Sequence, residues 1–200
     1  MKGFDIAAKA VATVDDTHLT FVGAPDGKQD EVKTRLLKCG IPAQRLTVRS
    51  FLQNRESLKN LLCEMDLAIM PSRTEGFGLT GLEALSAGLP VLVSGNSGFG
   101  VALSEVPFGS HAVIDSDDSH AWAKAIKDAR KKKRSNRLQE SKVLRALYEK
   151  KYNWKAQTKS LISNMSHITK GIKIFSVTFD LLRTSCQGLW YIYLQQKSLS

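Results

Sequence analysis

The chain has 200 residues, 42% of them hydrophobic, and its 29 basic and 19 acidic residues give a formal net charge of +10. This length suits one domain or at most two, and the hydrophobic content excludes a chain that is disordered throughout. The cysteines are three in number and lack metal-ligand spacing, which argues against both a disulfide framework and a zinc site.

The N-terminal region does not have a secretory pattern, because Lys9 interrupts the apolar stretch 6–14 before a hydrophobic region of usable length develops. No apolar run approaches the roughly 20 residues that cross a bilayer. The C-terminal apolar segments are broken by Lys173, Asp180 and Arg183. We therefore expect no transmembrane segment and a cytoplasmic location.

Strand-like and helix-like segments alternate along the chain. Strands are expected, in chain order, at residues 18–23, 46–48, 66–70, 90–94 and 111–114. Helices are expected at residues 30–38, 55–64 and 80–87, from residue 119 onward, and again after a break at Ser135-Asn136. Such alternation predicts an α/β fold with a doubly wound, Rossmann-like parallel sheet that helices cover on both faces.

The segment between the third and fourth expected strands combines a glycine loop with two glutamates, Glu75 and Glu83. Thr80 is placed to cap the following helix, with Glu83 three residues on as the acidic half of a capping box, and Gly88 and Pro90 mark the helix end. The unpaired N–H groups at such a helix start bind phosphate. The carboxylates would repel phosphate but accept hydrogen bonds from sugar hydroxyls, so the segment predicts a nucleotide-sugar site.

This segment resembles the E-x7-E signature of the retaining GT-B glycosyltransferases, the class that includes many sucrose, glycogen and mannosyl transferases. The resemblance rests on four runs of residues: Pro71-Ser72, Glu75-Gly76-Phe77-Gly78-Leu79, Glu83-Ala84-Leu85 and Gly88-Leu89-Pro90-Val91. The opening Lys2-Gly3-Phe4-Asp5 is also similar to the Lys-Gly element of that family.

The resemblance implies a role for each residue of the motif. Glu75 and Lys2 would be the catalytic residues, with Glu75 facing the donor sugar and Lys2 touching the donor phosphate. Glu83 would hold the ribose hydroxyls of the nucleotide. The further substrate-binding residues would be Gly76 and Phe77 in the loop and Gly78, Leu79 and Thr80, whose amides would face the diphosphate. The family stabilises the leaving diphosphate electrostatically, so neither a metal nor a cofactor is expected.

The resemblance runs in register to about residue 168, so we expect a nucleotide-sugar-binding lobe at residues 1–167 and an unassigned apolar and basic tail at residues 168–200. It covers a single lobe, the C-terminal donor-binding one, and the N-terminal acceptor-binding lobe is absent from it. The family's phosphate-binding arginine and the lobe's first strand would precede Met1. We therefore expect a sheet with a defect at its edge, in a fragment, a degenerate relative or half of an assembly.

Three functions remain open. The first is an enzyme lobe that binds a nucleoside-diphosphate sugar and transfers the glycosyl group with retention when paired with a separate acceptor lobe. The second is a non-catalytic nucleotide-sugar sensor or a degenerate relic. The third is a basic interaction module built on residues 130–137, although a solvated helix end is the favoured interpretation of that run and nucleic acid is not an expected partner.

Two further motifs have ordinary structural explanations. Asp115-Ser116-Asp117 matches a metal-binding Asp-x-Asp pattern, but its place between a strand and a helix capped at Ser119 indicates an acidic turn. The glycine cluster at residues 95–100 is either a second loop near the donor or a turn.

Overall fold

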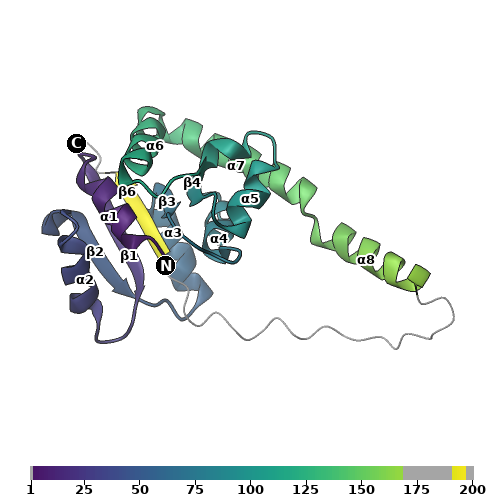
Figure 1. Cartoon of the computed structure of the whole chain (residues 1–200), viewed down its shortest axis with the longest axis horizontal. Helices are drawn as coiled ribbons and strands as arrows, with labels where there is room; N and C mark the ends of the chain where they lie inside the picture. Colours follow the sequence, from purple (N-terminus) through teal and green to yellow (C-terminus); the bar gives the residue numbers. More distant parts are fainter. Residues whose placement is uncertain (1, 169–190, 197–200) are drawn as a thin grey trace.

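The computed structural model describes residues 2–168 and 191–196, which form one six-stranded sheet between layers of helices (Figure 1). The strands are β1 (Thr17–Ala24), β2 (Leu46–Ser50), β3 (Leu67–Met70), β4 (Val91–Ser94), β5 (Val113–Ile114) and β6 (Tyr191–Gln196). The helices are α1 (Phe4–Ala12), α2 (Gln29–Leu37), α3 (Arg55–Glu64), α4 (Leu79–Ser86), α5 (Gly98–Ser104), α6 (Ser119–Lys131), α7 (Arg134–Lys151) and α8 (Trp154–Ile168), with 3-10 turns at Ala43–Arg45 and Gly109–Ala112.

The strands lie in the order β2-β1-β6-β3-β4-β5. The pairs β1–β2, β3–β4 and β4–β5 are parallel, which confirms the predicted parallel sheet for β1 to β5. The exception is β6, which runs antiparallel to both of its neighbours, β1 and β3.

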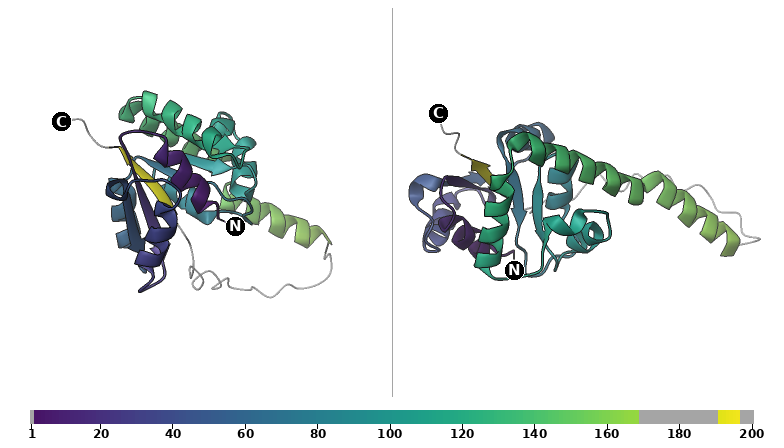
Figure 2. Two further views of the ribbon diagram at one scale, coloured as in Figure 1. Left: turned by 60° about the vertical axis from the view of Figure 1, so that its left-hand side comes forward. Right: turned by 90° about the horizontal axis from the view of Figure 1, so that it is seen from above.

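Helices cover both faces of the sheet (Figure 2). Side chains of α1, α2 and α6 pack with one face, and those of α3, α4, α5 and α7 pack with the other. Successive side chains of β3 alternate between the two faces: Leu67 and Ile69 belong to the first apolar cluster, and Ala68 and Met70 belong to the second. Both faces of the strand are apolar, so both need a covering layer of helices. The doubly wound architecture is therefore confirmed.

The parallel sheet is interrupted at its centre, where the antiparallel β6 lies, and not at an edge. The expected defect at the edge of the sheet is therefore wrong. The edges are formed by β2 and β5, and β6 lies between β1 and β3. A doubly wound sheet has the order 3-2-1-4-5-6, because its two halves build outward from a central first strand. Here β6 occupies the position of that first strand.

The turn between α6 and α7 differs from the prediction. Lys132 and Lys133 have extended backbone angles, with ψ of 140° and 145°, and α7 begins at Arg134. Ser135-Asn136 therefore lies within the helix and does not break it.

The region before α6 also differs. The strand predicted at residues 111–114 is reduced to Val113–Ile114, because Gly109–Ala112 forms a 3-10 turn. The N-cap of α6 is Asp118, whose carboxylate accepts the backbone N–H of His120 at 3.1 Å, and not the predicted Ser119.

The basic run at residues 130–137 is only partly solvated, so the favoured interpretation of a solvated helix end is wrong for part of it. Arg134 Nε lies 2.8 Å from Asp66 Oδ1, and Arg137 Nη2 lies 3.6 Å from the same oxygen. Arg137 is 6% exposed and donates to the carbonyl of Lys132 at 2.8 Å. These contacts hold the corner between α6 and α7 against the residue that precedes β3.

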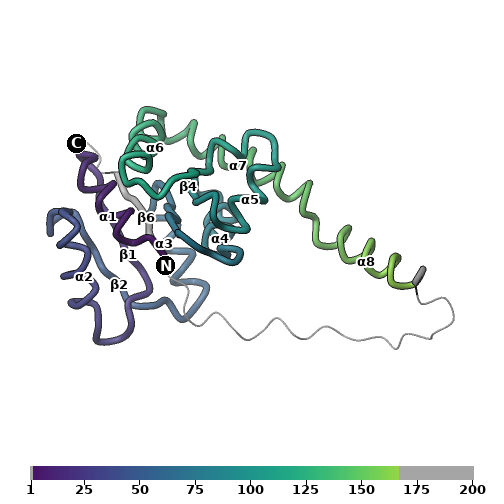
Figure 3. The backbone as a smooth tube through the Cα atoms, viewed as in Figure 1, coloured from purple at the N-terminus to yellow at the C-terminus, as the bar shows by residue number. Residues whose placement is uncertain are grey.

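Helix α8 extends away from the sheet and its helical layers (Figures 1 and 3). Its exposed large apolar side chains are Trp154, Leu161, Ile162 and Met165. Of the tail predicted at residues 168–200, residues 191–196 form β6, and residues 169–190 and 197–200 lie outside the described part. In the described part of the chain, every helix is too short or too polar to cross a membrane.

Candidate functional site

The candidate site lies at the edge of the sheet where the parallel strands β3 and β4 end. In doubly wound folds this carboxyl edge is where ligands bind. The loop after β3 runs beside the loop after β4, and three backbone hydrogen bonds join them: Glu75 N–H to Asn96 O (3.3 Å), Gly98 N–H to Gly76 O (3.0 Å) and Phe99 N–H to Phe77 O (2.7 Å). The glycine cluster at residues 95–100 therefore lies against the Glu75 loop and leads into α5.

Helix α4 starts without the predicted capping box. Its N-cap is Gly78, which has φ +97° and makes no side-chain cap hydrogen bond, and Thr80 lies inside the helix with 2% exposure. The predicted cap at Thr80 with its partner Glu83 is therefore wrong. The backbone turns into the helix through a left-handed residue, which glycine adopts at little steric cost. The first amides of the helix, including those of Leu79 and Thr80, have no intrahelical acceptor, as at the start of any α-helix, so anion binding here stays a prediction.

The end of α4 is as predicted. Gly88 has φ +86°, its N–H donates to Leu85 O at 2.9 Å, and the N–H of Leu89 donates to Ala84 O at 3.0 Å. This pair of bonds is the Schellman arrangement, in which a left-handed glycine ends a helix. Pro90 follows, and its carbonyl accepts the N–H of Ala68 in β3.

Lys2 and Glu75, the two predicted catalytic residues, are in direct contact. Lys2 Nζ lies 2.5 Å from Glu75 Oε2, with side-chain exposures of 34% and 17%. Ser72 Oγ donates to the same carboxylate oxygen at 3.5 Å. The approach depends on Gly3, which has φ +68° and where an added Cβ would lie 1.7 Å from Pro71 O. Any larger residue at position 3 would push Lys2 away from the end of β3.

A second ion pair, which the sequence analysis missed, lies beside the first. Arg73 donates to both carboxylate oxygens of Asp5, at 2.8 and 2.7 Å. This bidentate bond is the main reason that the pKa of Asp5 lies below its usual value. A signal was present, because Arg73 stands inside the motif and Asp5 inside the Lys-Gly element, but pairing them requires knowing that the start of α1 lies beside the loop after β3.

The predicted substrate-binding residues follow Glu75 in the sequence, and their side chains differ in exposure. Gly76, Phe77 and Leu79 are exposed, and Phe77 packs its ring against Phe99 at a centroid distance of 6.0 Å. Glu83 is half-buried on the second turn of α4.

The Asp-x-Asp motif forms the acidic turn that was predicted. Asp115 and Asp117 are exposed after β5, and the N–H of Asp118 donates to Ser116 Oγ at 3.1 Å. Within the part of the chain that the structure describes, no group of three His, Cys, Asp or Glu side chains is arranged to hold a metal ion.

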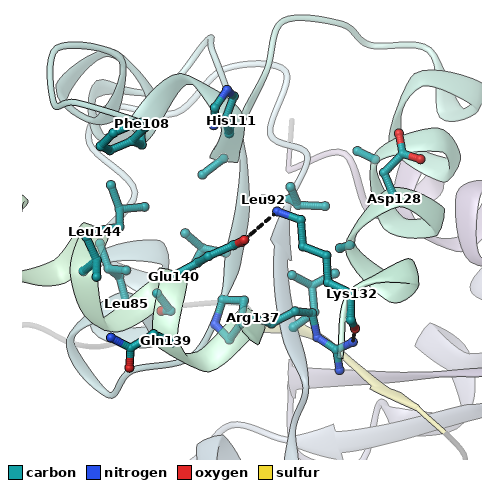
Figure 4. A pocket seen from close by; sticks show the side chains of 18 residues that line it. Leu85, Leu92, Phe108, His111, Asp128, Lys132, Arg137, Gln139, Glu140 and Leu144 are labelled. Carbon is teal, nitrogen blue, oxygen red and sulfur yellow. Dashed lines mark hydrogen bonds and ion pairs between the residues drawn. The ribbon is translucent and has the colours of Figure 1, made fainter. Parts of the chain in front are cut away.

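A cavity of about 710 Å³ lies at the other end of these strands, where β3 and β4 begin (Figure 4). Leu67 and Val91, the first residues of β3 and β4, line it, and Lys132 bonds to Glu140 across it. Because the candidate site follows the last residues of the same strands, this cavity is separate from it.

Comparison with known proteins assigns the family. A family described as "Family 4 Glycosyltransferase in conflict systems" matches residues 1–161. The chain belongs to this glycosyltransferase family. Among curated relatives of this family 4 chain, the D-inositol 3-phosphate glycosyltransferase of Mycolicibacterium smegmatis (strain ATCC 700084 / mc(2)155) is 34% identical over 134 residues, which are 64% of this chain and 30% of that protein. The one from Mycolicibacterium gilvum (strain PYR-GCK) is 31% identical over 132 residues, 63% of this chain and 28% of that protein.

The family 4 chain thus spans less than a third of the length of these curated relatives. Two solved structures share its fold. The sucrose-phosphate synthase of Thermosynechococcus elongatus has a TM-score of 0.68 and 21% identity, covering 84% of this chain and 43% of that one. WaaG, a glycosyltransferase involved in lipopolysaccharide biosynthesis, has a TM-score of 0.57 and 23% identity, covering 74% and 42%. The fold is that of a single Rossmann-like lobe of a GT-B glycosyltransferase.

Proposed function

We propose that this chain is a donor-binding lobe that holds a nucleoside-diphosphate sugar and transfers its glycosyl group with retention when a separate acceptor-binding lobe completes the site. The contact of Lys2 with Glu75, which lies in the loop that precedes α4, carries the proposal. It brings together a cation, a carboxylate and a helix N-terminus, and the ligand has complementary groups in a diphosphate and a ring of hydroxyls.

The diphosphate is the part of the ligand that Lys2 and α4 are suited to hold. A partly exposed lysine–carboxylate pair contributes about 0–1 kcal/mol to stability, so little free energy opposes its opening. A charge-assisted hydrogen bond to phosphate is worth roughly 1.5–3 kcal/mol. Lys2 can therefore turn from Glu75 to a phosphate oxygen, while the amides at Gly78, Leu79 and Thr80 face the second phosphate at the positive end of the helix dipole.

The two glutamates are suited to the hydroxyl groups on either side of the diphosphate. Glu75, released from part of its contact with Lys2, accepts from hydroxyls of the donor sugar. Glu83 accepts from the ribose hydroxyls of the nucleotide. Gly76 and Phe77 form the exposed rim of the loop, where bare backbone lets the ligand approach closely.

In the transfer step, the bond between the anomeric carbon and the diphosphate oxygen breaks and negative charge develops on the leaving diphosphate. Lys2 and the start of α4 stabilise that charge, which is the main electrostatic contribution this lobe can make. Glu75 keeps the sugar ring oriented toward the acceptor. The acceptor and any base that deprotonates it belong to the other lobe.

A nucleotide-sugar sensor is the second candidate. The groups that would hold the donor all lie within this lobe, so binding without transfer requires no acceptor site. The basic interaction module is disfavoured, because Arg134 and Arg137 are engaged with Asp66.

Calorimetric titration with uridine, guanosine and adenosine diphosphates and their glucose and mannose conjugates tests the proposal. We expect heat with the conjugates of one base, reduced in Glu83→Ala and unchanged in Glu56→Ala, an exposed glutamate on α3. The absence of heat with every ligand would refute donor binding. Binding without hydrolysis or transfer, in the presence of an acceptor lobe, would favour the sensor.

A further inference from the structure

The sheet consists of two parallel blocks that β6 joins. One block is β2-β1 and the other is β3-β4-β5, and within the strands that the structure describes the two blocks meet only through β6. The register of β6 against β1 covers six positions, from Thr17 opposite Gln196 to Val22 opposite Tyr191. Against β3 it covers two, with Leu67 opposite Leu194 and Ala68 opposite Tyr193.

The position between β1 and β3 has to be filled by a strand. Leu19, Phe21 and Val22 in β1 are at most 1% exposed, as are Ala68 and Ile69 in β3. Backbone N–H and C=O groups on the facing edges pair with β6, and they would lose these partners if β6 were absent. Unpaired backbone groups inside a sheet are rare in native proteins, so a strand in this position stabilises the two blocks.

The direction of β6 shows how it reaches this position. A strand joined to its parallel neighbours by crossover helices is held at both ends by the fold. In contrast, β6 is antiparallel and follows the projecting helix α8 in the sequence (Figure 1). It can leave the sheet without unwinding a crossover, which the other strands cannot do.

We propose that the space between β1 and β3 is a strand-binding site whose ligand is an extended peptide segment running antiparallel to β1. Residues 191–196 of this chain are its occupant. The affinity comes from backbone hydrogen bonds to both neighbours, as in other cases of β-strand addition, but here the added strand is internal to the sheet.

Occupation of this site has a consequence for the donor site, which rests on the proposed function. Lys2 precedes α1 and β1 in one block, whereas Glu75 follows β3 in the other. Binding of the tail strand therefore helps to hold the two halves of the donor site together. By thermodynamic linkage, donor binding and strand binding strengthen each other by the same factor.

Register-specific disulfides test the strand site in the full chain. Directly opposite positions of an antiparallel pair have neighbouring Cβ atoms on one face, whereas adjacent positions lie on opposite faces. In a background with serine in place of Cys39, Cys63 and Cys186, the in-register pairs are Thr20→Cys/Tyr193→Cys and Leu19→Cys/Leu194→Cys. The matched control, Thr20→Cys/Leu194→Cys, reuses the same positions out of register.

Of two successive in-register pairs, one is the closer, non-hydrogen-bonded type. We expect at least one of them to oxidise within a monomer, roughly tenfold faster or more than the control, because disulfide geometry is restrictive. Equal rates, or no cross-link in either in-register pair, would overturn the proposal. A disulfide between two copies would overturn the assignment of the chain's own tail as the occupant.

Hydrogen exchange gives a second measurement that does not depend on donor binding. Ile192→Pro removes a backbone N–H donor and disrupts strand pairing, whereas Ile192→Val keeps the donor and the pairing. We expect faster amide exchange in β1 and at the start of β3 for the proline variant alone. Unchanged protection in that variant would overturn the proposal. A chain that forms the in-register disulfide but binds no nucleotide sugar would refute the proposed function and leave the strand site standing.

Discussion

Lys2 Nζ and Glu75 Oε2 lie 2.5 Å apart although 73 positions separate the two residues in the chain. The pair ties the chain segment before α1 to the loop after β3, beside the bidentate pair of Asp5 and Arg73. The carboxylate of Glu75 neutralises the charge of the lysine. Under the proposed function, a phosphate would replace Glu75 as the partner of Lys2 and leave that carboxylate available for sugar hydroxyls.

Glu75→Gln separates the sugar contact from the phosphate contact. The amide keeps the size of the side chain and loses its charge, so we expect affinity for the nucleotide sugar to fall about tenfold, equivalent to roughly 1.4 kcal/mol. Affinity for the nucleoside diphosphate alone should stay the same or rise, because Lys2 no longer has a competing partner. Calorimetry on both ligands measures the difference, with Glu56→Gln as control. An equal loss for both ligands would contradict a sugar-specific role.

Lys2→Met removes the charge and keeps an apolar stem of similar reach. We expect the nucleoside diphosphate and its sugar conjugate to lose affinity by the same factor, about tenfold at low ionic strength, because the lost contact is to phosphate. The salt dependence of binding should weaken in parallel. Lys28→Met, at an exposed lysine outside the site, is the control. If Lys2→Met binds as well as the unmodified chain, Lys2 does not contact the phosphate.

Gly78→Ala and Gly76→Ala should act on different properties. Gly78 has φ +97°, so alanine there is strained and should lower the free energy of unfolding by about 1–2 kcal/mol. At Gly76 an added Cβ meets no heavy atom within 4 Å, so stability should change by less than about 0.5 kcal/mol. Its methyl group would nevertheless stand on the proposed face of ligand approach and weaken binding. Denaturant unfolding and calorimetry on both variants check this contrast, and a stable Gly78→Ala chain would contradict it.

The pair of Asp5 with Arg73 predicts a pH-dependent contribution to stability. Hydrogen bonding by Arg73 lowers the pKa of Asp5 in the folded chain, so its contribution is fully present above the unfolded pKa of about 3.9. It is lost as the pH falls through the lower, folded-state pKa. Asp5→Asn should therefore lower the melting temperature at pH 7, and the difference from the unmodified chain should shrink below about pH 4.

Thermal unfolding of both chains across pH 3 to 7 provides the measurement. Asp26→Asn, at an exposed aspartate in the turn after β1, is the control and should produce no comparable difference. A difference between Asp5→Asn and the unmodified chain that stays constant down to acid pH would show that the carboxylate charge does not contribute.

Arg137→Met tests the structural role of the basic run. Arg137 is buried and donates to Lys132 O, so its removal should cost about 1–3 kcal/mol of folding free energy. Lys133→Met, at an exposed position of the same run, should leave stability unchanged. Urea unfolding of the two variants measures the difference. Equal stability of the two variants would show that Arg137 contributes no more to folding than a solvated residue of the same run.

The local features of the fold were predictable because they depend on short-range patterns. The four buried residues of β3 and the apolar face of α3 follow from period and length, and the end of α4 follows from Gly88. The start of α4 was misplaced because Thr80 and Glu83 fit a capping pattern, while the decisive property was the left-handed backbone of Gly78. Sequence spacing alone cannot distinguish these two starts.

The sequence by itself determined the chemistry available to the site: glycines before a helix, and a lysine and two glutamates at spacings typical of one family. Only the tertiary structure decided which of these groups meet, because contacts such as Lys2–Glu75 and Asp5–Arg73 require the start of α1 to lie beside the loop after β3. It alone also placed residues 191–196 at the centre of the sheet. Backbone hydrogen bonds join strands irrespective of their distance in sequence, so no local pattern in the tail specifies which strands it will pair with.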